Sequence, residues 1–313
     1  MTGSARVLRN TFSWSPSRHE TFGECPRRYF YHYYGAWGGW SPDADPRARR
    51  LYVLKNLKGR QAWAGGVVHD AVAETLRLVR AGRPVPPEAG RAAGEAAVVR
   101  MRREFRDSRA GAYRARPKQA LGLMEHHYRE AIPDEEWRAQ ADAVRLAVLR
   151  FHEGPYLAEA RALAPEAWLA LEDLTSFELD GTPVFVRLDL AVRSPADRIT
   201  VVDWKTGRRA PRPEGLQLGT YALYVHQRWQ VPPEAITVRE VNLTAGAEGE
   251  ARIATAQIEA ARETIRQSLG AMRARLADAT ENRAEEADFA PRPAPRRCAH
   301  CPFREVCPER PRA

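Results

Sequence analysis

Hydrophobic residues at helical spacing dominate the first half of the chain. Residues 61–80 carry apolar side chains three or four positions apart, at Val68, Val72, Leu76 and Val79. This spacing places them on one face of a helix that ends before Gly82. The same periodicity continues over residues 88–163, with breaks near Pro117 and Pro133. The pattern therefore predicts a mainly helical region.

A shorter helix is predicted in the segment 15–35. Ser15 or Ser17 can cap its start, and Pro16 is tolerated in a first helical turn. The segment contains an aromatic run at residues 29–34. Such side chains can stack on unpaired bases. A stripe of this kind more often packs a helix onto its neighbour, and we expect this for most of its members.

After residue 164 the hydrophobic period changes to the alternation typical of strands. Three strands are predicted first, at 168–179, 182–192 and 198–204. A helix, a strand and a longer helix follow, at 214–229, 235–243 and 255–279. Asp180-Gly181 favours a tight hairpin turn between the first two strands. This order predicts a mixed α/β sheet with helices packed on it.

These patterns divide the chain into four expected parts. Residues 1–60 form a basic, aromatic segment, and 61–163 a helical region with one candidate histidine. Residues 164–280 contain the predicted sheet, and 281–313 hold most of the cysteines. With 313 residues, the chain is long enough to bury a substantial core.

No apolar run is long enough to span a membrane, and the first residues lack the apolar stretch of a secretory signal. We therefore expect a cytoplasmic protein without a membrane partner.

Positive charge is concentrated at the two ends. Residues 1–60 hold 11 Lys and Arg against 4 Asp and Glu, and residues 290–313 hold 6 against 2. The formal net charge of the whole chain is +9. A basic surface favours a polyanionic partner such as DNA, because binding releases counterions. Ordinary solubilising charge is the alternative.

Two aspartates and one lysine are predicted at the ends of neighbouring strands. Asp189 lies within the second strand, Asp203 near the end of the third, and Lys205 faces the same way two positions later. Two such carboxylates suit Mg²⁺ or Mn²⁺, which would acidify a bound water, and the amine could stabilise charge on a phosphate. Only 4 of 49 basic residues are lysines, which draws attention to Lys205. Turn-forming aspartates and a chance D-x-K are the alternative.

The stretches VRLDLAV, ITVVDWKTG and LQLGTYALY, with GGVVHDAV upstream, resemble the RecB-like branch of the PD-(D/E)xK nuclease superfamily. The resemblance implies a mixed central sheet of the restriction-endonuclease-like type, with flanking helices and a helical insertion. It implies metal binding by His69, Asp189, Asp203 and the carbonyl of Trp204. Lys205 would be the catalytic lysine. Gln217 and Tyr221 match a Q-x3-Y motif that supports the site and contacts DNA in relatives.

Several positions near these motifs allow two interpretations. Relatives usually have glycine three residues before the first metal-binding aspartate, where Val186 stands here. This predicts a tighter or differently twisted strand without loss of a ligand. The pair Gly65-Gly66 permits close backbone approach before His69, which would otherwise be a polar residue on an exposed helix face. Glu172 is either a further acidic member of the site or a solvent-facing strand residue.

The four cysteines form one pattern, Cys25 followed by Cys298, Cys301 and Cys307 in a C-x2-C-x5-C array. In a cytoplasmic protein this favours metal binding over disulfides, and four thiolates suit either a [4Fe–4S] cluster or structural zinc. The arrangement resembles the iron–sulfur nucleases related to AddB and the CRISPR-associated RecB-like exonucleases, which implies [4Fe–4S]. Such a clamp would join both basic ends beside the nuclease core and create a path for DNA.

We therefore expect a metal-dependent deoxyribonuclease that is either an exonuclease or prefers single strands, in repair, recombination or defence. A DNA-binding or assembly subunit with weak or no activity would be expected to lack an acidic ligand or the lysine, and neither is missing. An RNA nuclease would share these motifs. The sequence has no G-x4-G-K-[ST] phosphate loop, so unwinding would need a helicase or another repair or defence subunit as partner.

Overall fold

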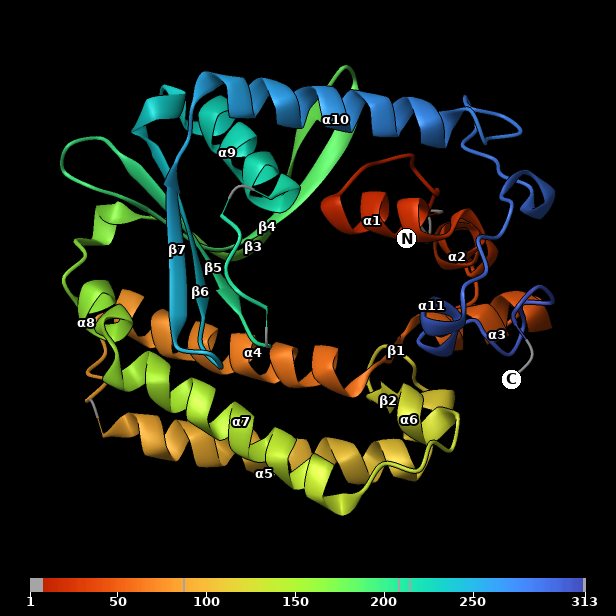
Figure 1. Ribbon diagram of the computed structural model, residues 1–313, viewed down its shortest axis with the longest axis horizontal. Helices are drawn as coiled ribbons and strands as arrows, with labels where there is room; N and C mark the ends of the chain where they lie inside the picture. The colour runs from red at the N-terminus through yellow and green to blue at the C-terminus, as the bar shows by residue number, and fades with distance from the viewer. Residues whose placement is uncertain (1–7, 87, 208, 214, 312–313) are drawn as a thin grey trace, which may run out of the picture. The chain divides into compact units, whose positions relative to one another are not determined.

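The computed structural model describes residues 8–86, 88–207, 209–213 and 215–311 (Figure 1). They divide into two compact units. The terminal unit comprises the described residues of Met1–Lys55, Glu178–Phe185 and Thr264–Ala313, and the central unit those of Asn56–Phe177 and Val186–Glu263. All four cysteines belong to the terminal unit, and all the predicted metal ligands belong to the central unit.

A five-stranded mixed sheet has the strand order β3-β4-β5-β6-β7. The strands are β3 (Trp168–Leu179), β4 (Thr182–Arg193), β5 (Ile199–Lys205), β6 (Ile236–Asn242) and β7 (Ala247–Arg252). β4 and β5 are antiparallel, as are β6 and β7, whereas β5 and β6 are parallel. Parallel neighbours need a crossover connection, and this one contains α9 (Leu216–Trp229).

The central unit packs one face of the sheet against long helices. These are α4 (Arg60–Arg80), α5 (Ala89–Arg109) and α7 (Asp134–Glu153), which run alongside one another in Figure 1. Their apolar side chains share one buried core with Leu190, Val202, Trp204 and Val241 of the sheet. Side chains alternate along a strand. Asp203 and Lys205 therefore project from the opposite face of β5 to Trp204, towards α9.

Short elements complete the central unit. They are β1 (Leu57–Lys58), η2 (Ala112–Arg114), β2 (Gly122–Leu123), α6 (Met124–His127), α8 (Pro155–Arg161), η3 (Pro165–Ala167) and η4 (Pro233–Ala235). β1 and β2 form a separate parallel pair. The helix α10 (Thr255–Arg273) begins in the central unit and ends in the terminal unit. Within the described residues, no helix has both the length and the apolar character needed to cross a bilayer.

The terminal unit joins segments from both ends of the chain. Its helices are α1 (Pro16–Glu24), α2 (Pro26–Phe30), the π-helical turn η1 (Tyr31–Gly35), α3 (Pro46–Lys55), η5 (Glu286–Asp288) and α11 (Pro295–Ala299). Tyr31 donates a 2.7 Å hydrogen bond to Glu286, and Nε of Arg27 donates one of 3.0 Å to the carbonyl of Phe289. Residues far apart in sequence therefore stabilise one another here.

The predicted elements agree closely with those observed, and the mixed α/β fold is confirmed. The Ser15 hydroxyl accepts a hydrogen bond from the backbone N–H of Arg18 and caps α1. Both Asp180 and Gly181 have positive φ, 49° and 70°, as a tight hairpin turn requires. The elements that were not predicted include the helices α3 and α11 and the strands β1, β2 and β7. The helix α10 ends at Arg273, earlier than the predicted end at residue 279.

The aromatic run at residues 29–34 is largely part of the core of the terminal unit. Tyr29, Phe30 and Tyr31 are buried. The rings of Tyr29 and Phe30 both lie within about 6 Å of the ring of Phe289, with centroid distances of 6.1 and 5.5 Å. Packing is therefore the main role of these three side chains, as expected for most of the run.

Candidate active site

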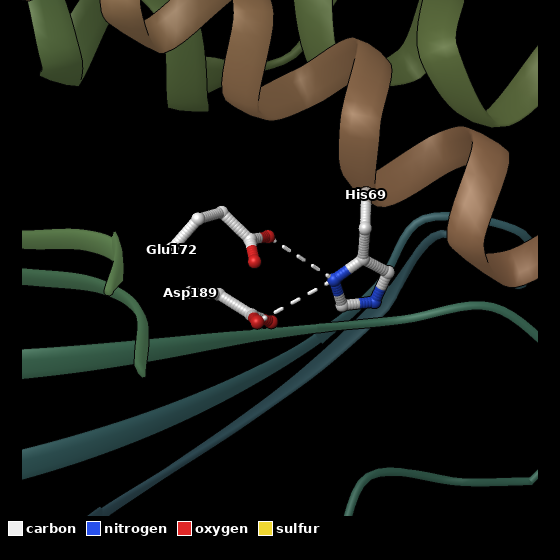
Figure 2. Close-up of side chains that lie close together, drawn as sticks. All are labelled: His69, Glu172 and Asp189. Atoms are coloured by element: carbon white, nitrogen blue, oxygen red, sulfur yellow. Dashed lines mark ion pairs between the residues drawn. The ribbon is translucent and has the colours of Figure 1, made fainter. Parts of the chain in front are cut away.

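A histidine and two carboxylates converge in the central unit (Figure 2). His69 projects from α4, Glu172 from β3 and Asp189 from β4. Nδ1 of His69 lies 3.5 Å from Oε1 of Glu172 and 3.4 Å from Oδ1 of Asp189. One ligand atom from each residue lies within 4.8 Å of the other two. The three side chains thus offer one nitrogen and two oxygens to a common point.

Asp189 is held by the neighbouring strand. Its Oδ2 accepts a 2.7 Å hydrogen bond from the backbone N–H of Trp204, which leaves Oδ1 to face His69. The Asp189 side chain is buried, and so is that of Asp203. Because Trp204 stands between Asp203 and Lys205 in β5, this bond fixes Asp189 relative to both residues.

The second aspartate forms a close pair with the lysine. Nζ of Lys205 lies 2.5 Å from Oδ2 of Asp203. Asp203 is not part of the close group formed by His69, Glu172 and Asp189. The structure therefore brings the predicted residues to one region, with the lysine amine nearest to the second aspartate.

Gln217 of α9 connects this pair to the helix. Its Oε1 accepts a 3.1 Å hydrogen bond from Lys205, and its Nε2 lies 3.3 Å from Oδ1 of Asp203 and 2.8 Å from the hydroxyl of Tyr221. The amide thus presents its oxygen to the ammonium and its nitrogen to the carboxylate. Gln217 and Tyr221 are one helical turn apart, which places both on the same face of α9.

Glu172 is the acidic residue whose role the sequence left open. Its backbone has a positive φ of 52°, which is unusual for a residue with a side chain. The regular alternation fails at this point, because Ala170 and Leu171 are both buried. The irregularity turns the Glu172 carboxylate towards His69, with only 12% of its side chain exposed. The solvent-facing interpretation of Glu172 is therefore wrong.

Negative charge determines the protonation of the cluster. Burial lowers the pKa of His69, but hydrogen bonds to Asp189 and Glu172, together with their charges, outweigh it and raise the pKa to about 10. Burial and the charge of Asp189 raise the pKa of Asp203, while Lys205 opposes the shift. Burial and the charge of Asp203 also raise the pKa of the Tyr221 phenol. The site therefore has an excess of negative charge that a cation would neutralise.

The donor set fits a divalent metal ion. Carboxylate oxygens are the preferred ligands of Mg²⁺ and Mn²⁺, and imidazole nitrogen is a common additional ligand. Oε1 of Glu172 is buried, and apart from the 3.5 Å contact with Nδ1 of His69 it has no polar partner among the described residues. An oxygen in this state is available for coordination. The carbonyl of Trp204 as a ligand remains a prediction.

Gly65 lies where α4 approaches the turn after β5. A Cβ atom at this position would be 2.7 Å from Oγ1 of Thr206, whereas one at Gly66 would have no neighbour within 4 Å. Of the two glycines before His69, only Gly65 is thus needed for the close approach of α4 to Thr206. Val186, at the position where relatives have glycine, is buried in β4.

The four cysteines form a separate cluster in the terminal unit. All four are free thiols, half-buried, and line one cavity of about 30 Å³. Backbone N–H groups lie near two of the sulfurs, that of Arg292 3.5 Å from Cys25 and that of Ala294 3.4 Å from Cys298. Burial raises the pKa of the Cys301 thiol to about 11. Among the described residues, no three of these sulfurs lie within 4.8 Å of one another.

The fold and the site together define an α/β protein of the nuclease class. A mixed sheet presents acidic residues and a lysine from adjacent strands, with a histidine from a neighbouring helix. The family model of the PD-(D/E)XK nuclease superfamily matches residues 13–308. The chain belongs to this superfamily, whose members are nucleases that generally use Mg²⁺ or Mn²⁺. A search of curated proteins finds no match.

Proposed function

We propose that this protein is a metal-dependent deoxyribonuclease that hydrolyses phosphodiester bonds at DNA ends or in single strands. The observation that carries the proposal is the convergence of His69, Glu172 and Asp189 next to the Asp203–Lys205 pair. None of the acidic ligands and no part of the D-x-K motif is missing. A DNA-binding subunit with a degenerate site would not need to retain this set.

The residues have distinct roles in the proposed reaction. His69, Glu172, Asp189 and Asp203 would hold the metal. When bound, a divalent ion lowers the pKa of a coordinated water and polarises the phosphate. Lys205 supplies a compact positive charge that can stabilise negative charge developing on the phosphate or orient the attacking water.

Gln217 keeps the Lys205 amine in place through its amide oxygen. Tyr221 restrains Gln217 in turn, since the two side chains are hydrogen-bonded. We assign both of them positioning roles. A further role for either in contacting DNA is part of the same proposal.

For the cysteines we propose a [4Fe–4S] cluster, with structural zinc as the alternative. The four cysteines line one cavity, and their arrangement of one N-terminal and three C-terminal cysteines resembles that of the iron–sulfur nucleases, which favours the cluster. The N–H groups near Cys25 and Cys298 are of the kind that tune iron–sulfur clusters. Such a cluster would clamp α2 and α11 together within the terminal unit.

The biological setting we propose is repair, recombination or defence, with exonuclease action. A helicase or another subunit of such a system would supply unwinding where duplex DNA is the starting material.

The proposal is tested by incubating the purified protein with end-labelled single- and double-stranded DNA. Parallel reactions contain Mg²⁺, Mn²⁺ or EDTA. We expect cleavage with Mg²⁺ or Mn²⁺ and none with EDTA, and the product lengths distinguish action at ends from internal cleavage. A parallel reaction with labelled RNA tests the alternative substrate. Absence of cleavage under every metal condition contradicts the proposal.

A further inference from the structure

A cavity of about 640 Å³ adjoins the candidate active site within the central unit. Its lining comes from α4, α7, the turn after β5 and Thr244 in the turn after β6. Val68 on α4 precedes His69 directly, and Thr206, in the turn after β5, directly follows Lys205. Gln140 and Ala143 contribute the α7 side. The cavity is thus one residue away, along the chain, from both the candidate histidine ligand and the candidate catalytic lysine.

The residues that line the cavity favour a nucleobase over a phosphate as its ligand. Of the described residues in the lining, the two charged ones are Arg60 and Glu136, and they form an ion pair with each other. A phosphate would meet the Glu136 carboxylate and a guanidinium that is already neutralised. A nucleobase is uncharged and avoids this cost.

The remaining lining combines apolar walls with carboxamides. Ala64, Val68 and Val144 supply aliphatic surface, while Gln61 and Gln140 supply amides. Nε2 of Gln140 donates to the carbonyl of Arg60, and its Oε1 has no partner among the described residues. Carboxamides can both donate to and accept from the edges of bases. Apolar walls with a few polar groups are the usual composition of a site for a small ligand.

We propose that this cavity binds one unpaired nucleobase of the DNA strand, next to the phosphate that is cleaved. This inference rests on the proposed nuclease function and specifies its substrate. The volume lies within the roughly 300–1,000 Å³ typical of ligand pockets. Gly65 is important here, because its missing side chain lets α4 lie close to Thr206. The cavity and the candidate site are therefore connected through consecutive residues, Val68 and His69 in α4 and Lys205 and Thr206 at the end of β5.

A base inside this cavity cannot remain paired or stacked in a duplex. Enzymes that hold a base in a pocket must take it out of the helix or act on strands that are already single. The cavity thus selects single-stranded or frayed DNA at the point of cleavage. It provides a physical reason for strand preference that is independent of the metal ligands.

The test compares DNA binding by proteins in which the cavity is filled or altered. Ala143→Phe fills the cavity from α7, and Gln61→Ala removes an exposed carboxamide with little risk to folding. Ala96→Phe is the matched control, because this exposed alanine of α5 lines a different cavity. Binding of a fluorescein-labelled single strand, a duplex and an abasic single strand is measured by anisotropy with Ca²⁺, with intact oligonucleotide verified on gels.

We expect Ala143→Phe to weaken binding of the ordinary single strand about tenfold or more, as loss of one base contact implies. Gln61→Ala should weaken it by a smaller factor. Neither variant should change binding of the duplex or the abasic strand, and Ala96→Phe should behave as wild type. If both cavity variants bind the single strand as tightly as wild type does, the inference is wrong. Should Ala143→Phe fail to fold, Gln61→Ala decides alone.

The binding measurement tests the role of the cavity independently of DNA hydrolysis. Binding with Ca²⁺ requires no turnover, whereas the proposed function is tested by cleavage with Mg²⁺ or Mn²⁺. If the cavity variants bind single strands more weakly but the protein never cleaves DNA, base binding in the cavity is supported and the proposed nuclease function is contradicted. If both cavity variants still cleave DNA and bind the single strand as wild type does, the nuclease function is supported and base binding in the cavity is contradicted.

Discussion

The side-chain oxygen of Gln217 accepts a 3.1 Å hydrogen bond from the Lys205 ammonium. The two residues come from different elements, α9 and the end of β5. The same amide reaches Asp203 with its nitrogen. A helix outside the acidic strands therefore determines where the only lysine of the second half of the chain lies.

Gln217→Ala should reduce cleavage about 10- to 100-fold, the usual effect of losing a group that orients a metal site. Lys205 would lose one of its two acceptors and keep Asp203, and Asp203 would lose a donor, while the fold is kept. The measurement is the initial rate of DNA cleavage with Mn²⁺. Gln227→Ala, on the same helix, is the control and should leave the rate unchanged. Equal rates for Gln217→Ala and wild type would show that the bridge has no functional role.

Lys205→Arg should be nearly as inactive as Lys205→Ala, with a loss of roughly 100-fold or more. The ammonium lies between Asp203 and Gln217, where a wide planar guanidinium cannot take the same position. Rates are compared at saturating DNA, with Lys58→Arg as the control because Lys58 is exposed in β1. An active Lys205→Arg protein would mean that positive charge alone is sufficient at this position.

The sequence predicted most of the sheet because its strands follow simple rules. Apolar, β-branched residues alternate or run together in β4, β5 and β6, and turn residues separate them. The strand β7 escaped prediction because Ala247–Arg252 is short and largely charged, as edge strands often are. The helix α3 follows a loop rich in proline and glycine. Four of its first five residues are Pro or Arg, so its apolar positions do not form a clear helical pattern in the sequence.

The strand pattern predicted that Asp189, Asp203 and Lys205 lie near one another, the family resemblance added His69, Gln217 and Tyr221, and the position of Glu172 was left open; the roles of these residues remain predictions. The spacing of the motif residues was sufficient to predict that the two aspartates and the lysine lie near one another, since neighbouring strands bring their ends together. The direction of the Glu172 side chain depends on a positive φ in the middle of β3, and alternation rules assume a regular strand. The contact of Gly65 with Thr206 likewise depends on how α4 crosses the turn after β5, which local pattern does not encode.

Gly65→Ala should slow DNA cleavage, whereas Gly66→Ala should leave its rate unchanged. In a helix, each replacement of glycine by alanine favours folding by up to about 1 kcal/mol. Only the methyl group at position 65 would press on Thr206, next to Lys205. We expect Gly65→Ala to slow cleavage several-fold, whereas Gly66→Ala keeps the wild-type rate and melts at a slightly higher temperature. Similar rates for both variants would contradict the assigned role of Gly65.

Cys298→Ser should remove one ligand of the proposed cluster and lower the melting temperature by roughly 5 °C or more, because loss of a metal site is among the strongly destabilising changes. The control is Ala299→Ser, which introduces the same residue at the exposed neighbouring position. Anaerobically purified wild-type protein should contain about four irons per chain, with less in Cys298→Ser. One zinc and no iron would identify the alternative centre, and unchanged melting would argue against any clamp.

The most direct test of the central claim uses Asp203→Ala. This change removes the carboxylate that pairs with Lys205 at 2.5 Å and that the proposed metal site requires. Cleavage of end-labelled single-stranded DNA with Mn²⁺ is followed over time for wild type and variant, alongside binding with Ca²⁺ and thermal melting. We expect cleavage to fall at least about 100-fold while melting and binding change little. A folded Asp203→Ala protein that cleaves DNA at the wild-type rate would contradict the central claim.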